Sequence, residues 1–315
     1  MVSVSVVIPS RNAGPLFREV LSRLREQEYP GGIEIVVIDS GSTDATLELA
    51  SEYGAVVRSI PPSEFDHGLT RNRGIELASG EIIVLMSQDA VPGDRDLVRN
   101  FVRAFEDPKI AGAYARQVPR SDADIITKRN LGRWLTGRKA QEVRWIQDWD
   151  AYRQMSPMQR HRFYNFDDVC SAIRRDVWRS IPFRAQEFGE DIDWSQRALE
   201  AGWKIAYWPS SFVVHSHPRS IRYEYRRNFQ TLKKLYAQYR LCTVPTWASV
   251  ISTSLRVVVR DLIYAIRHER RPRRLLETLI RVPALGVALV YGQYRGAMEA
   301  KREISRLQPK SAATE

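Results

Sequence analysis

Cysteine is scarce in this sequence, with only Cys170 and Cys242 among its 315 residues. Two cysteines cannot form a disulfide scaffold or a four-cysteine zinc site, and this scarcity is typical of a reducing compartment. Long apolar runs are missing too: the best one, residues 282–292, has about half the ~20 residues of a membrane-spanning helix. The opening MVSVSVVIPSRN lacks the charged region and apolar stretch of a signal peptide. We therefore expect a cytoplasmic globular protein.

Internal repeats and low-complexity tracts are also lacking, and the composition is that of an ordinary folded protein. Apolar residues make up 43% and charged residues 27% of the chain, which excludes wholesale disorder and fibrous architectures. A chain of this length buries roughly three quarters of the surface that it exposes when unfolded. The length favours about two domains, or one large α/β domain with an appendage.

Basic residues are concentrated in the last hundred residues. The formal net charge is +11, yet residues 1–215 hold 28 basic and 30 acidic residues, a net charge of −2. Residues 216–315 hold the other 20 basic and 7 acidic residues, a net charge of +13. Arginines cluster in RHERRPRR at 267–274, and the surrounding segment contains these apolar and aromatic residues: Trp247, Ile251, Leu255, Val258, Leu262, Tyr264, Leu276, Leu279 and Ile280.

Two interpretations fit this basic region. The simpler one is a solvated helix face, which is the usual meaning of a run of charges. The other is a set of amphipathic helices that lie on an anionic membrane surface, because basic and apolar residues alternate at helical spacing. Nucleic acid would attract the same charges, but we find no base-reading motif and expect no nucleic-acid partner. The helices could also pair two copies into a homodimer.

The first half of the chain alternates β-branched runs with helical patterns. Nearly continuous apolar strands that alternate with helices predict a doubly wound α/β domain, whose functional residues lie at the carboxyl ends of its strands. The expected strands are residues 3–8, 33–39, 55–60 and 81–87, and the expected helices are residues 16–27, 42–53 and 69–78.

The second half is less regular. Residues 118–165 predict a long insertion with irregular helices, followed by ordered segments at 168–178, 190–201 and 204–215. Residues 218–240 and 246–306 predict helices interrupted at Pro245, Pro272 and Pro283. We therefore divide the chain into a nucleotide-binding and catalytic domain, 1–217, and a basic helical region, 218–315.

Two expected strands end in acidic residues. Asp39 opens the turn DSGSTD, and Asp89 follows the strand VLMSQD about fifty residues later. Each acid by itself is equally well explained as a turn or helix cap. If both strand ends lie at the same edge of the sheet, a carboxylate at that edge could hold a divalent ion against a diphosphate.

These segments together resemble a known family. VVIPSRN, DSGSTD, HGLTRNRG, SQDA, and FGEDIDWSQRALEAGW followed by VVHSH resemble the family 2 nucleotide-sugar glycosyltransferases. The resemblance covers residues 3–217, and the SQDAVP and EDIDWSQR variants are similar to those of bacterial rhamnosyltransferases. It implies the GT-A fold, a Rossmann-like, mainly parallel mixed sheet flanked by helices.

The resemblance also implies residues that hold the donor. Pro9, Arg11 and Asp39 would line the pocket for the base and ribose, with Asp39 accepting a hydrogen bond from a pyrimidine N–H. Arg71 and Asn72 would face the diphosphate, since planar arginine donors match phosphate oxygens. A structural arginine at the start of a helix is the alternative. Gln88, beside Asp89, completes the expected donor-binding set.

The implied metal site departs from the family pattern. The motif Asp-any-Asp is Ser87-Gln88-Asp89 here, so Asp89 would be the direct ligand and Ser87 could bind only through water. His215, with His217 as the neighbouring candidate, matches the second ligand. Mg²⁺ or Mn²⁺ would fit, because such ions use few protein carboxylates together with substrate phosphates.

Asp191 matches the general base of the family. It would take the proton of an acceptor hydroxyl as that oxygen attacks the sugar, in a single displacement that inverts the anomeric centre. Helix capping is the alternative explanation of acids in a first helical turn. Cys170 and Ser171 have no obvious base partner and are read as pocket-lining or core residues.

The resulting expectation is an inverting, metal-dependent glycosyltransferase at the inner face of the cell membrane. It would move a sugar, with L-rhamnose from dTDP-rhamnose as first choice, to a lipid-linked or polysaccharide acceptor in cell-surface glycan synthesis. Three alternatives stay open: a UDP- or GDP-sugar donor, a non-catalytic binding module recruited to membranes, and a sugar-1-phosphate nucleotidyltransferase. The last would need a glycine-rich phosphate loop, of which Pro9–Gly14 is a poor version.

Overall fold

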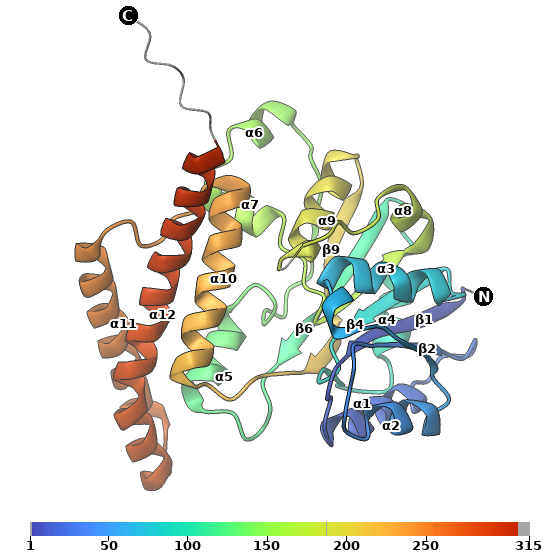
Figure 1. The fold of residues 1–315 in the computed structure, drawn as a ribbon, viewed down its shortest axis with the longest axis horizontal. Coiled ribbons are helices and arrows are strands. Elements are labelled where there is room, and N and C mark those ends of the chain that lie inside the picture. The colour runs from blue at the N-terminus through green and yellow to red at the C-terminus, as the bar shows by residue number, and fades with distance from the viewer. Residues whose placement is uncertain (1, 187, 308–315) are drawn as a thin grey trace, which may run out of the picture. The chain divides into compact units, whose positions relative to one another are not determined.

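The computed structural model describes residues 2–186 and 188–307 and places them in two compact units (Figure 1). The first unit contains the chain up to Ser121, Leu131–Gln154 and Arg162–Ser216. The second contains Asp122–Asn130, Met155–His161 and the chain from His217 onward. Two short stretches of the insertion, Asp122–Asn130 and Met155–His161, therefore belong to the second unit. The expected division into 1–217 and 218–315 placed both of them in the first domain.

The first unit is built on a nine-stranded mixed sheet in the order β3-β2-β1-β4-β8-β6-β9-β5, with β7 also paired to β9. Six strands run in one direction, and β5, β7 and β8 run against them. The expected mainly parallel α/β sheet is thus confirmed. The strands are β1 Val4–Ser10, β2 Glu34–Asp39, β3 Val56–Ser59, β4 Ile82–Met86, β5 Val91–Pro92, β6 Ile110–Val118, β7 Glu142–Arg144, β8 Cys170–Arg174 and β9 Lys204–Val214.

Helices cover both faces of this sheet, as Figure 1 shows for α1 and α3. Val4, Val6 and Ile8, alternate residues of β1, pack into one core with α1 and α4. Val7 points to the other face, where Gly74 lets α3 lie against it. The helices of the first unit are α1 Leu16–Arg25, α2 Thr46–Glu52, the 3₁₀ turn η1 Pro62–Glu64, α3 His67–Leu77, α4 Leu97–Ala104, α6 Trp149–Arg153, α8 Arg175–Ser180 and α9 Glu190–Glu200. Two more helices, α5 Ile125–Arg133 and α7 Pro157–Phe163, lie mainly in the stretches that belong to the second unit.

The second unit is dominated by three long helices, α10 Ile221–Tyr239, α11 Trp247–His268 and α12 Pro272–Leu307. Helix α12 approaches α10 closely, since a Cβ on Gly292 or Gly296 would lie 2.5 or 2.1 Å from a carbonyl oxygen of α10. Helix α11 is held by a buried ion pair, with 2.7 Å between Arg129 Nη2 and Asp261 Oδ1.

Prolines in this unit act differently from expectation. Pro245 precedes α11 and Pro272 begins α12, where proline is tolerated because the first N–H groups of a helix have no partner. Pro283 lies inside α12 without ending it, so the expected interruption there is wrong. The side chain of Pro283 is exposed, which leaves room for its ring on the outer side of the helix. Because α12 is continuous, it is longer than the apolar run expected from the sequence. By length and composition alone, α12 is apolar enough to cross a bilayer.

The contact between α3 and β1 gives a test of the fold. A Cβ on Gly74 would lie 2.3 Å from Val7 Cγ1, so Gly74→Ala should lower the free energy of unfolding by ~1–3 kcal/mol through overpacking. The matched control is Gly132→Ala in α5, where a Cβ meets nothing within 4 Å and alanine should be neutral or stabilising. Urea unfolding of the three proteins measures both effects. Equal midpoints for Gly74→Ala and the wild type would contradict the packing described here.

Candidate active site at the carboxyl edge of the sheet

The co-directional strands end at one edge of the sheet and bring distant residues together there. Strands β1, β2 and β4 lead into the Ser10–Asn12 segment, Asp39 and Asp89, respectively. Strand β9 ends directly before His215, whose backbone N–H donates to the Val118 carbonyl of β6. The expected gathering of polar residues at this edge is what the topology produces.

Asp39 is the centre of the loop after β2. It is buried, and Oδ2 accepts the backbone N–H groups of Gly41 and Ser42 at 3.0 and 2.9 Å. Oδ1 accepts the hydroxyls of Ser42 and Ser10, at 2.5 and 3.1 Å. These four bonds fill the acceptor capacity of a carboxylate. A contact from Asp39 to a base N–H stays a prediction, and it requires one serine hydroxyl to rotate away.

Gln88 connects the ends of β1 and β4. Its side-chain oxygen accepts the N–H of Arg11 at 2.7 Å, and its amide nitrogen donates to the Arg11 carbonyl at 3.2 Å. These two bonds fix the backbone after Pro9, while the Arg11 side chain stays exposed. Ser87 donates its backbone N–H to the Val169 carbonyl. Gln88 therefore shapes the predicted donor pocket by holding Arg11.

Asp89 and His215, 126 positions apart in the chain, meet with 3.6 Å between Asp89 Oδ1 and His215 Nε2. Two ligands side by side on an octahedral Mg²⁺ are about 3 Å apart, so a small adjustment would let both atoms bind one ion. A carboxylate oxygen and an imidazole nitrogen are also ligands that Mn²⁺ accepts. The neighbouring candidate, His217, belongs to the second compact unit. The residues present therefore fit a divalent cation.

Arg71 and Asn72 have their polar atoms engaged inside the first unit. Arg71 Nη1 lies 2.7 Å from Glu190 Oε1, and Arg71 Nε lies 3.2 Å from Asp168 Oδ2. Asn72 donates to the Phe183 carbonyl and accepts from the Trp178 indole N–H, both at 2.8 Å. This geometry matches the structural alternative. A contact of either side chain with a diphosphate stays a prediction that their placement does not support.

Asp191 lies in the first turn of α9, beside a buried group of acids. Its oxygens accept the backbone N–H of Ile192 at 2.8 Å and, more weakly, that of Asp168 at 3.5 Å. Burial raises the pKa of Asp191 well above its usual range, and the negative charges of Glu190, Asp168 and Asp167 raise it further. A carboxylate of raised pKa is a suitable proton acceptor near neutral pH.

Asp168 is perturbed by the same surroundings. Burial raises its pKa to about 7 against the opposing charge of Arg71, with Glu190 adding to the increase. Its Oδ1 also accepts the Ser171 hydroxyl at 2.6 Å, so Ser171 is a partner of this acid. Cys170 is buried in the core of the first unit, which raises the pKa of its thiol.

A chain of contacts that sequence reasoning missed links Asp191 to the pair of Asp89 and His215. Asp168 contacts Asp191, and the adjacent Asp167 accepts from the Gln117 amide at 2.7 Å. The Gln117 oxygen lies 3.0 Å from His215 Nδ1, and His215 faces Asp89. Two adjacent acids at 167–168, just before β8, could have been recognised in the sequence as candidate site residues. Nothing in the sequence around Gln117 indicates a role in the site.

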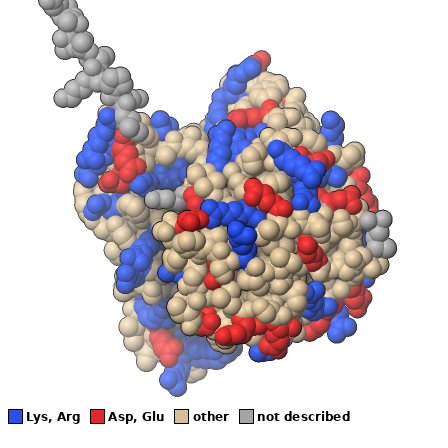
Figure 2. Space-filling view, turned by 45° about the vertical axis from the view of Figure 1, so that its right-hand side comes forward, with Lys and Arg blue, Asp and Glu red and all other residues tan. Residues whose placement is uncertain are grey.

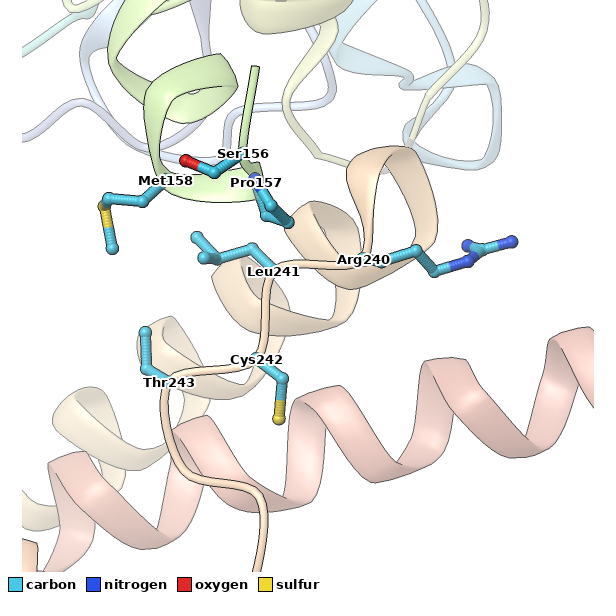
Figure 3. Close-up of a pocket in the computed structure, with 7 residues that line it drawn as sticks. All are labelled: Ser156, Pro157, Met158, Arg240, Leu241, Cys242 and Thr243. Atoms are coloured by element: carbon cyan, nitrogen blue, oxygen red, sulfur yellow. The ribbon is translucent and has the colours of Figure 1, made fainter. Parts of the chain in front are cut away.

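The second unit contains an open hollow of about 510 Å³, shown in Figure 3. Leu241 points toward Pro157 and Met158, while Arg240 points away from them. Its lining contains neither an acid nor a histidine, and it brings together none of the predicted site residues. The candidate site therefore remains the sheet edge of the first unit.

Known sequences place the chain in a family. The family model "Glycosyltransferase like family 2" matches residues 2–238. The O-antigen chain rhamnosyltransferase RfbN of Salmonella typhimurium is 30% identical over 233 residues, which cover 72% of this chain and 71% of that protein. The O-antigen chain rhamnosyltransferase WbaN of Salmonella anatum is 27% identical over 238 residues, 73% of this chain and 71% of that one.

Solved structures share the fold. The mannosyltransferase PcManGT of Pyrobaculum calidifontis, solved with GDP-Man and Mn²⁺, aligns with a TM-score of 0.55 and 20% identity over 97% of this chain and 76% of its own. Residues 1–349 of TarS from Staphylococcus aureus, with UDP-GlcNAc, align with a TM-score of 0.54 and 14% identity over 96% and 92%. The sheet, the family match and the relatives agree: this chain belongs to glycosyltransferase family 2 and is a glycosyltransferase of the GT-A type.

Proposed function

We propose that this glycosyltransferase is inverting and metal-dependent, and that it transfers L-rhamnose from dTDP-L-rhamnose to a lipid-linked or polysaccharide acceptor. The sugar and the acceptor class are inferred from the similarity to RfbN and WbaN, both O-antigen chain rhamnosyltransferases. The donor class is inferred from PcManGT and TarS, whose structures hold GDP-Man and UDP-GlcNAc. Synthesis of a cell-surface glycan is the setting that these relatives suggest.

The observation that carries the proposal is the connected geometry of Asp191 with Asp89 and His215. A single displacement needs one carboxylate to accept the acceptor's proton and a positive group at the departing diphosphate. Asp191 suits the first task because its pKa is raised, whereas its neighbours Glu190 and Asp168 are ion-paired with Arg71. A protein nucleophile is unnecessary in this route, which is why the acceptor oxygen would invert the anomeric centre.

Asp89 and His215 are the residues that would hold Mg²⁺ or Mn²⁺. Such an ion, when bound, would supply positive charge to the diphosphate oxygens of the donor. Ser87 stands where the family motif has its first acid, so the protein contributes a single carboxylate from this motif. We infer that the donor phosphates supply further ligands, as is usual for Mg²⁺.

A donor panel with a base variant tests the activity. Wild-type protein with Mg²⁺ or Mn²⁺ should turn over dTDP-rhamnose faster than UDP- or GDP-sugars in a nucleotide-release assay. Asp191→Asn should reduce transfer by roughly 10²–10⁴-fold, because it removes the proton acceptor, while calorimetry should show nearly unchanged dTDP binding. No turnover with any nucleotide sugar would contradict the proposal, and an active Asp191→Asn would assign the base elsewhere.

The raised pKa of Asp191 predicts a pH dependence. Below this pKa the carboxyl is protonated and cannot accept a proton, so the transfer rate should fall with decreasing pH well above the range of an ordinary aspartate. Asp193→Asn, on the same helix, is the matched control, because Asp193 pairs with Arg197 at 2.9 Å. A pH–rate profile of the wild type and this variant should show the same acid limb, and an acid limb near pH ~4, the range of an ordinary aspartate, would refute the assignment.

We further propose that α11 and the first half of α12 attach the protein to an anionic membrane from the cytoplasmic side. Along α11, exposed apolar residues recur every three or four positions, opposite the buried face that holds Asp261. Ile251 and Ile280 are each 70% exposed, which is unusual for isoleucine. Apart from Trp247 at the start of α11, the large exposed apolar residues are Ile251, Leu255, Val259, Ile263 and Ile266 on α11, and Leu276, Ile280 and Val287 on α12. We call them the apolar stripe.

Basic side chains accompany the apolar stripe. At 100° per residue, the exposed Arg256, Arg260 and Arg267 lie along one flank of α11. Figure 2 shows basic groups, interspersed with uncharged surface and a few acidic groups, along the left side of the view. Arginines beside apolar side chains favour an anionic bilayer surface, at ~1 kcal/mol for each basic residue. Of the apolar residues in the basic region, Val258, Leu262, Tyr264 and Leu279 are only partly exposed.

Vesicle sedimentation tests the surface attachment. Wild-type protein should co-sediment with vesicles of phosphatidylcholine and one third phosphatidylglycerol, and much less with phosphatidylcholine alone or in high salt. The triple variant Ile251→Gln, Leu255→Gln and Ile263→Gln should bind weakly, while the exposed Val56→Gln of β3 serves as control. Membranes from cells should release the protein in alkaline carbonate. Retention would mean that α12 spans the bilayer, contrary to surface attachment.

A further inference from the structure

Gln117 sits between an acid and the imidazole of His215, on strand β6. Strands β6 and β9 are parallel neighbours with Val118 opposite Val214, and this register sets Gln117 beside His215. All three polar side chains of the group lie in the first unit: Asp167, Gln117 and His215. Gln117 and His215 are 9% and 8% exposed, so bulk water competes little for their polar atoms.

Asp167 fixes which way the Gln117 amide points. Asp167 Oδ1 accepts the backbone N–H of Val169 at 3.0 Å, and Oδ2 accepts from Gln117 Nε2 at 2.7 Å. An ionised carboxylate only accepts hydrogen bonds, so the NH₂ group of Gln117 must face Asp167. The reverse orientation would set the amide oxygen against the carboxylate. The Gln117 oxygen is therefore directed at His215.

The Gln117 oxygen in turn selects the tautomer of His215. It lies 3.0 Å from Nδ1, and an amide oxygen only accepts, so Nδ1 carries the hydrogen. In the neutral ring Nε2 then keeps its lone pair, and this atom is 3.6 Å from Asp89 Oδ1. Two electron-rich atoms at this separation attract a cation, which is either a proton on Nε2 or a metal ion bound by both atoms.

We propose that Gln117, locked by Asp167, is a positioning residue that holds His215 in the Nδ1–H tautomer and so presents Nε2 to a divalent cation shared with Asp89. The inference rests on the metal dependence in the proposed function. It adds Gln117 and Asp167, which act through His215 and are not themselves ligands of the cation. Outer partners of metal-binding histidines fix ring orientation in this way, and their loss typically weakens metal binding about 10- to 100-fold.

Three variants separate this role from general packing. Gln117→Met keeps the length of the side chain and removes its acceptor. Asp167→Asn leaves Gln117 in place but lets its amide turn over, because an asparagine can donate or accept. The double variant Gln117→Glu with Asp167→Asn restores the pattern, because the new amide at position 167 donates to the new carboxylate at position 117. That carboxylate then accepts from Nδ1–H of His215. Gln196→Met, a polar-surface change on α9, is the control.

Tautomers are read directly by long-range ¹H–¹⁵N correlation spectra of protein labelled with ¹⁵N-histidine. The chain has five histidines, and the signal that disappears in His215→Gln identifies His215. Wild type and Gln196→Met should show a protonated Nδ1 and a bare Nε2. Gln117→Met and Asp167→Asn should lose this preference, and the double variant should recover it. Each protein is measured at a temperature equally far below its own thermal midpoint.

Mn²⁺ affinity gives the second readout. Electron paramagnetic resonance of free Mn²⁺, with and without dTDP, should show about 10- to 100-fold weaker binding in Gln117→Met and Asp167→Asn, with recovery in the double variant. Unchanged tautomer and affinity in Gln117→Met would overturn the proposal, as would a folded double variant that fails to recover. If His215→Gln itself leaves Mn²⁺ binding unchanged, the cation site of the proposed function is wrong, which is a separate failure.

Discussion

The ion pairs of Arg71 allow acids to gather at the carboxyl edge of the sheet. Asp168 and Glu190 are both buried, and a buried carboxylate without a partner would cost several kcal/mol or take up a proton. The guanidinium from α3 lies between them and offsets this penalty. Both acids can therefore stay beside Asp191 and raise its pKa. The reactivity proposed for Asp191 therefore depends on two neighbouring acids that are held by the guanidinium of Arg71 on α3.

Strand pairing brings Asp89 and His215 to the same edge of the sheet as this acidic group. Strand β9 pairs in parallel with β6, so His215 emerges at the same edge as Asp89 although the two are far apart in the chain. The loops at that edge are stiffened from within, by the four bonds to Asp39 and by the two between Gln88 and Arg11. The edge thus combines a charged centre with a backbone that is already arranged before any ligand arrives.

Sequence reasoning predicted the strand and helix alternation of residues 3–87 and the meeting of Asp89 with His215. The alternation follows from apolar periodicity, and the meeting of Asp89 with His215 follows from the family resemblance of the segments that contain them. It could not predict that Arg71 and Asn72 are engaged by Glu190, Asp168 and Phe183, because partner choice depends on how α3 packs. The role of Gln117 could not be predicted for the same reason, because its contact with His215 depends on the register between β6 and β9. Pro283 stays inside α12 at an exposed position, which spacing alone does not reveal.

The second unit is assembled from three separate stretches of chain, and this limits how the protein can be shortened. Arg129 comes from the first stretch and His161 from the second, and their partners Asp261 and Tyr239 come from the C-terminal helices. Cutting the chain after Ser216 would take these two partners away from a buried guanidinium and a buried imidazole on the remaining part. A stable catalytic fragment would therefore need new residues at 122–130 and 155–161, and not merely a stop codon.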